Sequence, residues 1–189
     1  MTIAQQRPAR KKSAAQRLWF LHWLMALFYL LIFVSGRVMV SFSDSFTYRE
    51  TFYDFHKVLG AAVMSLLLGR ISVLLLALRH KYRRRQPERK GDWLQTVALH
   101  TALYFFMLIV PLSGYFFSNS AGYEVKIFQT GLVLPRLFPT NKPLYDLAQS
   151  FHFWISYTFL AFIILHSVDQ RKYLRAQMRR FSKALVSSK

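Results

Sequence analysis

Residues 151–168, FHFWISYTFLAFIILHSV, form an apolar run that carries a histidine near each end. The run is long enough to cross a bilayer as one helix. His152 and His166 are fourteen positions apart, which on an α-helix is about 21 Å along the axis and about 40° around it. One face of a single membrane helix would therefore present an imidazole at each side of the membrane. Ionisable residues at membrane depth usually mark function, so this stripe predicts a functional site at both sides.

The composition agrees with a membrane protein. The 189 residues are 53% hydrophobic, yet the formal net charge is +18. The apolar residues come in blocks and the charges fall between them, which is the pattern of membrane spans and their connecting loops. The chain has no cysteine. This excludes disulfides, thiolate ligands and iron–sulfur clusters, and leaves histidine and oxygen atoms as the metal ligands.

Four apolar stretches are each long enough to span the membrane. Together they form the predicted membrane domain, residues 18–168, between a basic tail at 1–17 and a second basic tail at 169–189. No internal repeat is apparent. The predicted fold is an all-α membrane protein, a four-helix bundle. The predicted spans are 18–40, 54–78, 93–117, which contains Pro111, and 146–168.

The basic residues predict the orientation. Most of the 26 lysines and arginines lie in the two tails and in the loop at 79–92. The positive-inside rule then places both termini in the cytoplasm of a multi-pass protein. The same charge would attract anionic lipid. Few aromatic side chains are interleaved with the basic residues, so we expect no nucleic-acid partner.

The histidines fall into two layers. His56 and His152 begin their predicted helices at the outer side, whereas His22, His100 and His166 lie near the cytoplasmic side. A lone histidine in a membrane helix is more often a packed or hydrogen-bonded residue than a ligand. Paired imidazoles in two layers reverse that expectation. They predict two haems b, each held by two histidines and stacked across the membrane inside a four-helix bundle.

The inner partner of His166 is either His22 or His100. A haem needs room beside its ligand, and the residue one turn deeper is Ala26 after His22 but Tyr104 after His100. This favours His22 as the iron ligand. His100 is then either a hydrogen-bonded core residue or a contact to a haem propionate or a quinone.

Arg70 lies fourteen positions after His56, at the predicted depth of the inner haem. A buried arginine needs an anion, and a haem propionate would supply one. The alternative is that its long side chain reaches the cytoplasmic surface.

The ordered set of these residues resembles the bacterial cytochrome b561 family, which is related to the di-haem cytochrome b subunits of nickel–iron hydrogenases and formate dehydrogenases. The resemblance implies that His22 and His166 hold the inner haem b, and that His56 and His152 hold the outer one. The residues that carry it are Arg17, Leu18, His22, Trp23, His56, Gly60, Arg70, His100, Tyr104, Pro111, Gly114, His152 and His166.

The resemblance also implies electron transfer in the bacterial inner membrane, between quinone and a small-molecule or protein partner at the outer face. One member type oxidises superoxide and reduces ubiquinone, but it carries further histidines where this chain reads SVDQR at 167–171. Two functions stay open. One is a quinone oxidoreductase similar to superoxide oxidase, and the other is a membrane anchor and electron-relay subunit of a larger dehydrogenase or hydrogenase. A haem-free scaffold or transporter is a third alternative.

The loop at 118–145 is the longest connection. Its apolar middle is expected to lie on the membrane surface over the outer haem. Lys126, Arg136 and Lys142 outnumber the single acidic residue, Glu124. Such a charge would attract a small anion such as superoxide, or it would merely anchor the loop to lipid headgroups.

Overall fold

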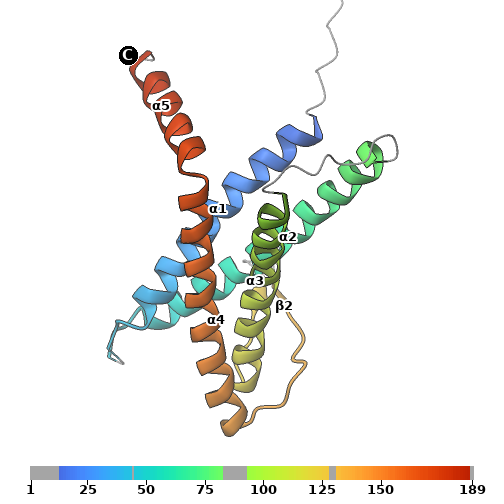
Figure 1. The fold of residues 1–189 in the computed structure, drawn as a ribbon. Helices are drawn as coiled ribbons and strands as arrows, with labels where there is room; N and C mark the ends of the chain where they lie inside the picture. Colours follow the sequence, from blue (N-terminus) through green and yellow to red (C-terminus); the bar gives the residue numbers. More distant parts are fainter. Residues whose placement is uncertain (1–12, 44, 83–92, 128–130, 188–189) are drawn as a thin grey trace, which may run out of the picture. The chain divides into compact units, whose positions relative to one another are not determined.

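The computed structural model describes residues 13–43, 45–82, 93–127 and 131–187. Two compact units divide the chain: α1 and α2 form the first, and the later elements form the second. The elements are α1 (Ala14–Met39), α2 (Arg49–Tyr82), α3 (Trp93–Ser120), β1 (Lys126–Ile127), β2 (Leu132–Val133), α4 (Lys142–Asp169) and α5 (Arg171–Ser187) (Figure 1).

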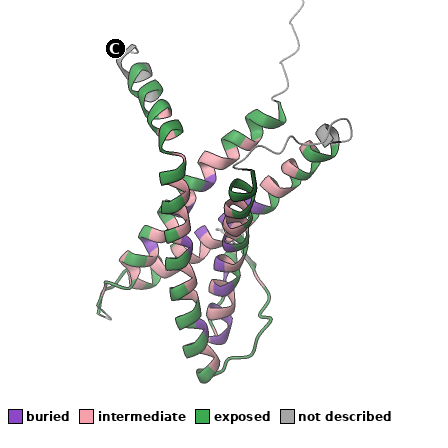
Figure 2. Cartoon of the chain, viewed as in Figure 1, coloured by how far each residue is buried: buried purple, intermediate pink, exposed green. Residues whose placement is uncertain are grey.

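Four of the described helices, α1 to α4, are long and apolar enough to cross a membrane. Their surfaces expose large apolar side chains, such as Leu30 with 61% exposure and Trp154 with 66%. Buried positions are few along these helices, and most residues are intermediate or exposed (Figure 2). Apolar surface of this kind suits contact with lipid rather than water. The predicted all-α membrane architecture with four spans is therefore confirmed.

The first unit is a hairpin of α1 and α2. Ser13 begins α1 through a capping box: its hydroxyl accepts from Gln16 N at 3.3 Å, and the Gln16 side chain accepts from Ser13 N at 2.9 Å. This pair satisfies two of the donors that every helix start leaves open. The contact between the two helices buries apolar side chains and one tyrosine. They are Met25, Tyr29, Leu59, Ala62, Val63 and Leu67.

The second unit packs α3 against α4. Phe106 of α3 stacks on Phe159 at 5.9 Å and contacts Phe162 at 4.9 Å between ring centroids. These contacts fill the middle of the hairpin with aromatic rings. The helix α3 continues through Pro111 for nine further residues to Ser120.

The loop between α3 and α4, predicted to lie at the outer side, folds back on the end of α3. Gly122, with a φ of +80°, allows Gly122 N to donate to Asn119 O and Tyr123 N to Ser118 O, both at 2.9 Å. This is a Schellman cap, which satisfies carbonyls that the helix end would leave open. The Asn119 side chain then accepts from Leu137 N at 2.8 Å. Asn119, at 1% exposure, thus ties the loop to the helix.

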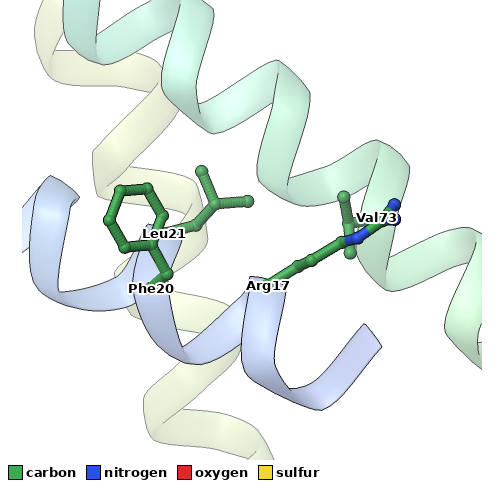
Figure 3. A pocket seen from close by; sticks show the side chains of 4 residues that line it. All are labelled: Arg17, Phe20, Leu21 and Val73. Carbon is green, nitrogen blue, oxygen red and sulfur yellow. The ribbon is translucent and has the colours of Figure 1, made fainter. Parts of the chain in front are cut away.

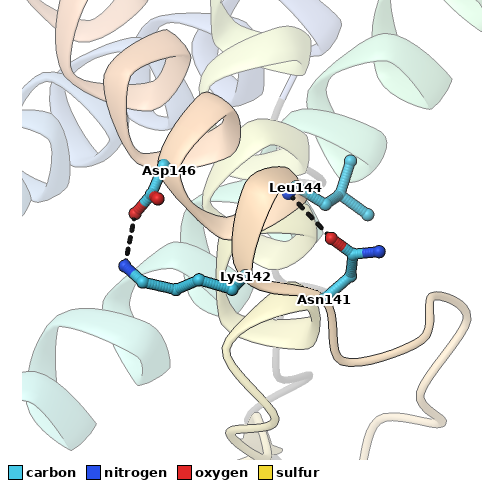
Figure 4. Close-up of polar contacts among 4 residues, drawn as sticks. All are labelled: Asn141, Lys142, Leu144 and Asp146. Carbon is cyan, nitrogen blue, oxygen red and sulfur yellow. Dashed lines mark hydrogen bonds and ion pairs between the residues drawn. The ribbon is translucent and has the colours of Figure 1, made fainter.

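The strands β1 and β2 form a short antiparallel pair in this loop, in which Ile127 is opposite Leu132. The loop ends where Asn141 caps α4 by accepting from Leu144 N at 3.1 Å (Figure 4). The next residue, Lys142, pairs with Asp146 one turn further along α4 at 2.7 Å (Figure 4). At the other end, Gln170 closes α4 and α5 follows directly.

The helices are longer than their apolar stretches. The span predicted at 54–78 lies within α2, which begins at Arg49 and ends at Tyr82. Hydropathy marks the part of a helix in hydrocarbon, whereas the helix itself continues through polar residues at the interface. The tail predicted at 169–189 contains α5. Most of the predicted N-terminal tail, residues 1–12, and most of the basic loop, residues 83–92, lie outside the described residues.

Candidate functional site

His56 packs closely against two small residues of α1, Ser35 and Gly36, which we call its seat. Its Nδ1 lies 3.0 Å from Ser35 Oγ, and that hydroxyl donates to Ile32 O at 2.9 Å. The next residue is Gly36, where a Cβ atom would come within 2.9 Å of His56 Cε1. Real Cβ atoms essentially never approach so closely. The Ser35–Gly36 pair therefore holds the imidazole by a hydrogen bond and makes room for its edge.

His152 occupies an equivalent seat in the second unit. Its Nδ1 lies 2.8 Å from Ser113 Oγ, which donates to Val110 O at 2.7 Å. A Cβ at Gly114 would lie 3.0 Å from His152 Cε1. The outer histidine of each hairpin is thus held by a serine–glycine pair on the preceding helix.

The histidines predicted for the inner layer lie at the other end of each helix pair. His100 of α3 and His166 of α4 are in edge-to-face contact, with ring centroids 5.2 Å apart. His100 Nδ1 donates to Thr96 O at 2.7 Å, because a carbonyl oxygen can only accept. In the first unit, His22 packs edge-on against Trp23 at 5.6 Å.

The predicted site residues are divided equally between the two units. His22, His56 and Arg70 belong to the first unit, and His100, His152 and His166 belong to the second. Each predicted ligand pair, His56 with His152 and His22 with His166, takes one histidine from each unit. The pairings therefore stay predictions.

The first helices of the two hairpins share a pattern that the sequence analysis did not recognise. His22 precedes Ser35 by thirteen positions in α1, and His100 precedes Ser113 by the same thirteen in α3. In each case a glycine follows the serine, and the serine contacts the outer histidine of its own hairpin. The repeated His–13–Ser–Gly spacing is the signal by which Ser35 and Ser113 could have been found.

The second helices repeat a pattern as well. Arg70 follows His56 by fourteen positions in α2, and His166 follows His152 by fourteen in α4. Arg70 therefore stands where the other hairpin has an inner histidine. No internal repeat was expected, and the surrounding apolar residues differ too much to reveal these shared spacings.

Two hollows lie near the inner ends of the helix pairs. One, between α1 and α2, is lined by Arg17, Phe20, Leu21 and Val73, with the Arg17 side chain extended along it toward Val73 (Figure 3). The other, between the start of α3 and the end of α4, is more polar. It is lined by Gln95, Thr96, Leu99, Asp169 and Gln170.

The histidine seats fit haem ligation. Engaging Nδ1 leaves Nε2 as the ring nitrogen for a metal, which is how metal-bound histidines are usually arranged. Among the described residues no group of three or more His, Asp or Glu side chains could hold a metal ion on its own. A haem suits such a donor set, because the porphyrin supplies the other iron ligands and the protein adds only axial ones.

Comparison with known proteins points to the same cofactor. The sequence model of a family described as prokaryotic cytochrome b561 matches residues 13–168. Cytochrome b561 homolog 2 from Escherichia coli (strain K12) is 25% identical over 145 residues, which cover 77% of this chain and 76% of that protein. The chain therefore belongs to the prokaryotic cytochrome b561 family, multi-pass membrane proteins that transfer electrons across the membrane through b-type haem.

Proposed function

We propose that this protein carries electrons across the bacterial inner membrane between quinone and a partner at the outer face, using two haems b. His56 and His152 hold the outer haem, and His22 and His166 hold the inner one. When bound, each haem supplies a one-electron redox centre. The observation that carries the proposal is the pair of matched seats for His56 and His152.

The seats support one outer haem shared by the two hairpins. Each hairpin has a single histidine at its outer end, and each of these uses Nδ1 for a serine. A haem b of this kind would need two histidine ligands. One imidazole from each hairpin meets that need.

The contact between His100 and His166 bears on the inner ligand. Their ring centroids are 5.2 Å apart, the distance of two aromatic rings in contact. Two histidines that hold one haem would be separated by it, so rings in contact do not suit that role. This favours His22 over His100 as the partner of His166, in agreement with the small residue Ala26 one turn deeper.

The remaining polar residues assist the haems and the quinone. Arg70 offsets the charge of an inner haem propionate. His100 contacts the inner haem edge or the quinone, and the polar hollow beside Thr96 and Leu99 is our candidate for the quinone headgroup. Two histidines on each haem would leave no iron position open, so the haems would carry electrons rather than bind oxygen.

Two ion pairs weaken the case for superoxide as the outer partner. Arg136 lies 3.9 Å from Glu124, and Lys142 lies 2.7 Å from Asp146. Two of the three loop cations therefore have a carboxylate beside them, which reduces the attraction for a small anion. We therefore rank quinone-linked electron transfer with another outer partner ahead of superoxide oxidation.

The proposal is tested on the purified chain alone, reconstituted in lipid. Addition of quinol should reduce both haems and give a b-type difference spectrum, and a quinone-site inhibitor should block this. A second set of assays supplies superoxide instead of quinol as the reductant. If quinol leaves both haems oxidised unless a further subunit is added, the chain is the relay subunit of a larger complex instead.

A further inference from the structure

The two serines that hold the outer histidines make the same double contact. Ser35 Oγ lies 2.9 Å from Ile32 O and 3.0 Å from His56 Nδ1. Ser113 Oγ lies 2.7 Å from Val110 O and 2.8 Å from His152 Nδ1. Both serines are buried, at 6% and 5% exposure.

Only one proton arrangement makes every one of these contacts a hydrogen bond. A hydroxyl has one hydrogen, and a carbonyl oxygen can only accept. If the serine donated to the histidine, its oxygen and the carbonyl oxygen would face each other as two acceptors less than 3 Å apart. The serine therefore donates to the carbonyl, and Nδ1–H of the histidine donates to the serine. For His152 the Val110 carbonyl is a second acceptor within reach of the ring N–H. The lone pair of the neutral ring is then on Nε2.

We infer that Ser35 and Ser113 are positioning residues for the outer haem: they fix the Nδ1–H tautomer of His56 and His152 and lower the potential of the haem that these two histidines hold. The inference rests on the proposed outer haem, and it adds two residues that act on it through its ligands. The same arrangement occurs on two separate helix pairs, so it does not depend on one local geometry.

The direction of the effect follows from the hydrogen bond. An acceptor on Nδ1–H gives the imidazole more anionic character and makes Nε2 a stronger donor to the metal. The serine is a better acceptor because it also donates to a carbonyl. A stronger axial donor favours ferric over ferrous iron. Removal of the serine hydroxyl should therefore raise the outer haem's potential.

The experiment is a potentiometric titration of the holoprotein with Ser35→Ala, Ser113→Ala and the double variant. Each single change should move the outer haem to a more positive potential, and the double change should move it further. The low-spin ferric electron-paramagnetic-resonance signal of that haem should shift as well. The inner haem should keep its potential. Ser→Thr at either position restores a hydroxyl and should restore the potential.

Ser120→Ala is the matched control. Ser120 lies two turns beyond Ser113 on α3, is 1% exposed, and donates to Phe117 O at 2.9 Å through the same backward bond. It should leave both potentials unchanged, because its hydroxyl donates to the backbone and not to a histidine.

The outcomes separate the inference from the proposed function. Unchanged potentials in both alanine variants, with both haems present, would overturn the role of the serines. Loss of the outer haem in the alanine variants and its return in the threonine variants would support it, since removal of a ligand's hydrogen-bond partner weakens metal affinity about 10- to 100-fold. Loss of the outer haem in both the alanine and the threonine variants would overturn it. In that case the size of the side chain, and not its hydroxyl, would decide whether the haem binds. His56→Ala is measured alongside, and if it leaves both haems in place, the ligand assignment itself is wrong.

Discussion

At the scale of single residues, the choice between His22 and His100 decides how the inner haem is held. His22→Ala should remove the inner haem and leave the outer one, because His166 alone cannot make the iron six-coordinate. His100→Ala should keep both haems, since its ring contacts that of His166 and its Nδ1 is bonded to Thr96 O. The measurement is the haem-to-chain ratio with the reduced spectrum of each variant.

The opposite pattern of haem loss would contradict this assignment. If His100→Ala abolishes the inner haem while His22→Ala retains it, the ligand assignment is reversed. In that case the contact between His100 and His166 must open when haem binds.

Arg70 gives a second prediction at this scale. It stands in α2 where the other hairpin has His166, fourteen positions after the outer histidine. A cation beside the inner haem stabilises the reduced form, so Arg70→Gln should lower that haem's potential by the equivalent of about 1 kcal/mol. Arg70→Lys keeps the charge and serves as the control. If the two variants have equal potentials, the side chain reaches the cytoplasmic surface instead.

At the scale of elements, the close approach of each helix pair depends on glycine. Gly36→Ala would place a Cβ 2.9 Å from His56 Cε1, and Gly114→Ala would place one 3.0 Å from His152 Cε1. Both contacts are with a ring held by a hydrogen bond, so the ring must move. We expect either variant to lose most of the outer haem and to keep the inner one, as measured by the haem-to-chain ratio.

Gly69→Ala is the matched control for this pair. It lies in the middle of α2, where an added Cβ meets nothing within 4 Å. Alanine favours a helix over glycine by about 1 kcal/mol, so this variant should bind both haems and be at least as stable. Haem loss in all three variants would mean that glycine serves helix flexibility and not the histidine seat.

The elements also show why the sequence predicted part of the site. The four spans and the histidine depths follow from hydropathy and helix rise, which are local properties. The seats at Ser35 and Ser113 depend on contacts between helices across 21 and 39 residues. A serine in a membrane helix has many uses, so its type alone did not mark it. The helix α5 was missed because its charged sequence has no apolar run long enough to suggest a span.

At the scale of the whole molecule, the distribution of lysine and arginine predicts the direction of insertion. The helix α5 carries six basic residues after the end of α4: Arg171, Lys172, Arg175, Arg179, Arg180 and Lys183. At the other end of α4, Lys142 is paired with Asp146, and in the preceding loop Arg136 is near Glu124. Basic residues close to a span resist translocation, so α5 should remain in the cytoplasm and the strands β1 and β2 should face outward.

Reporter fusions measure this directly. A fluorescent protein fused after residue 189 should fluoresce, and alkaline phosphatase fused at the same point should be inactive, because it needs the oxidising outer compartment. Alkaline phosphatase fused after Tyr123, beyond the Schellman cap of α3, should be active. Replacing the six basic residues of α5 with glutamine should lower the fraction of chains with this orientation, whereas the same number of changes at exposed polar positions of the outer loop should not. Active phosphatase at residue 189 would show that the charge of α5 does not set the topology.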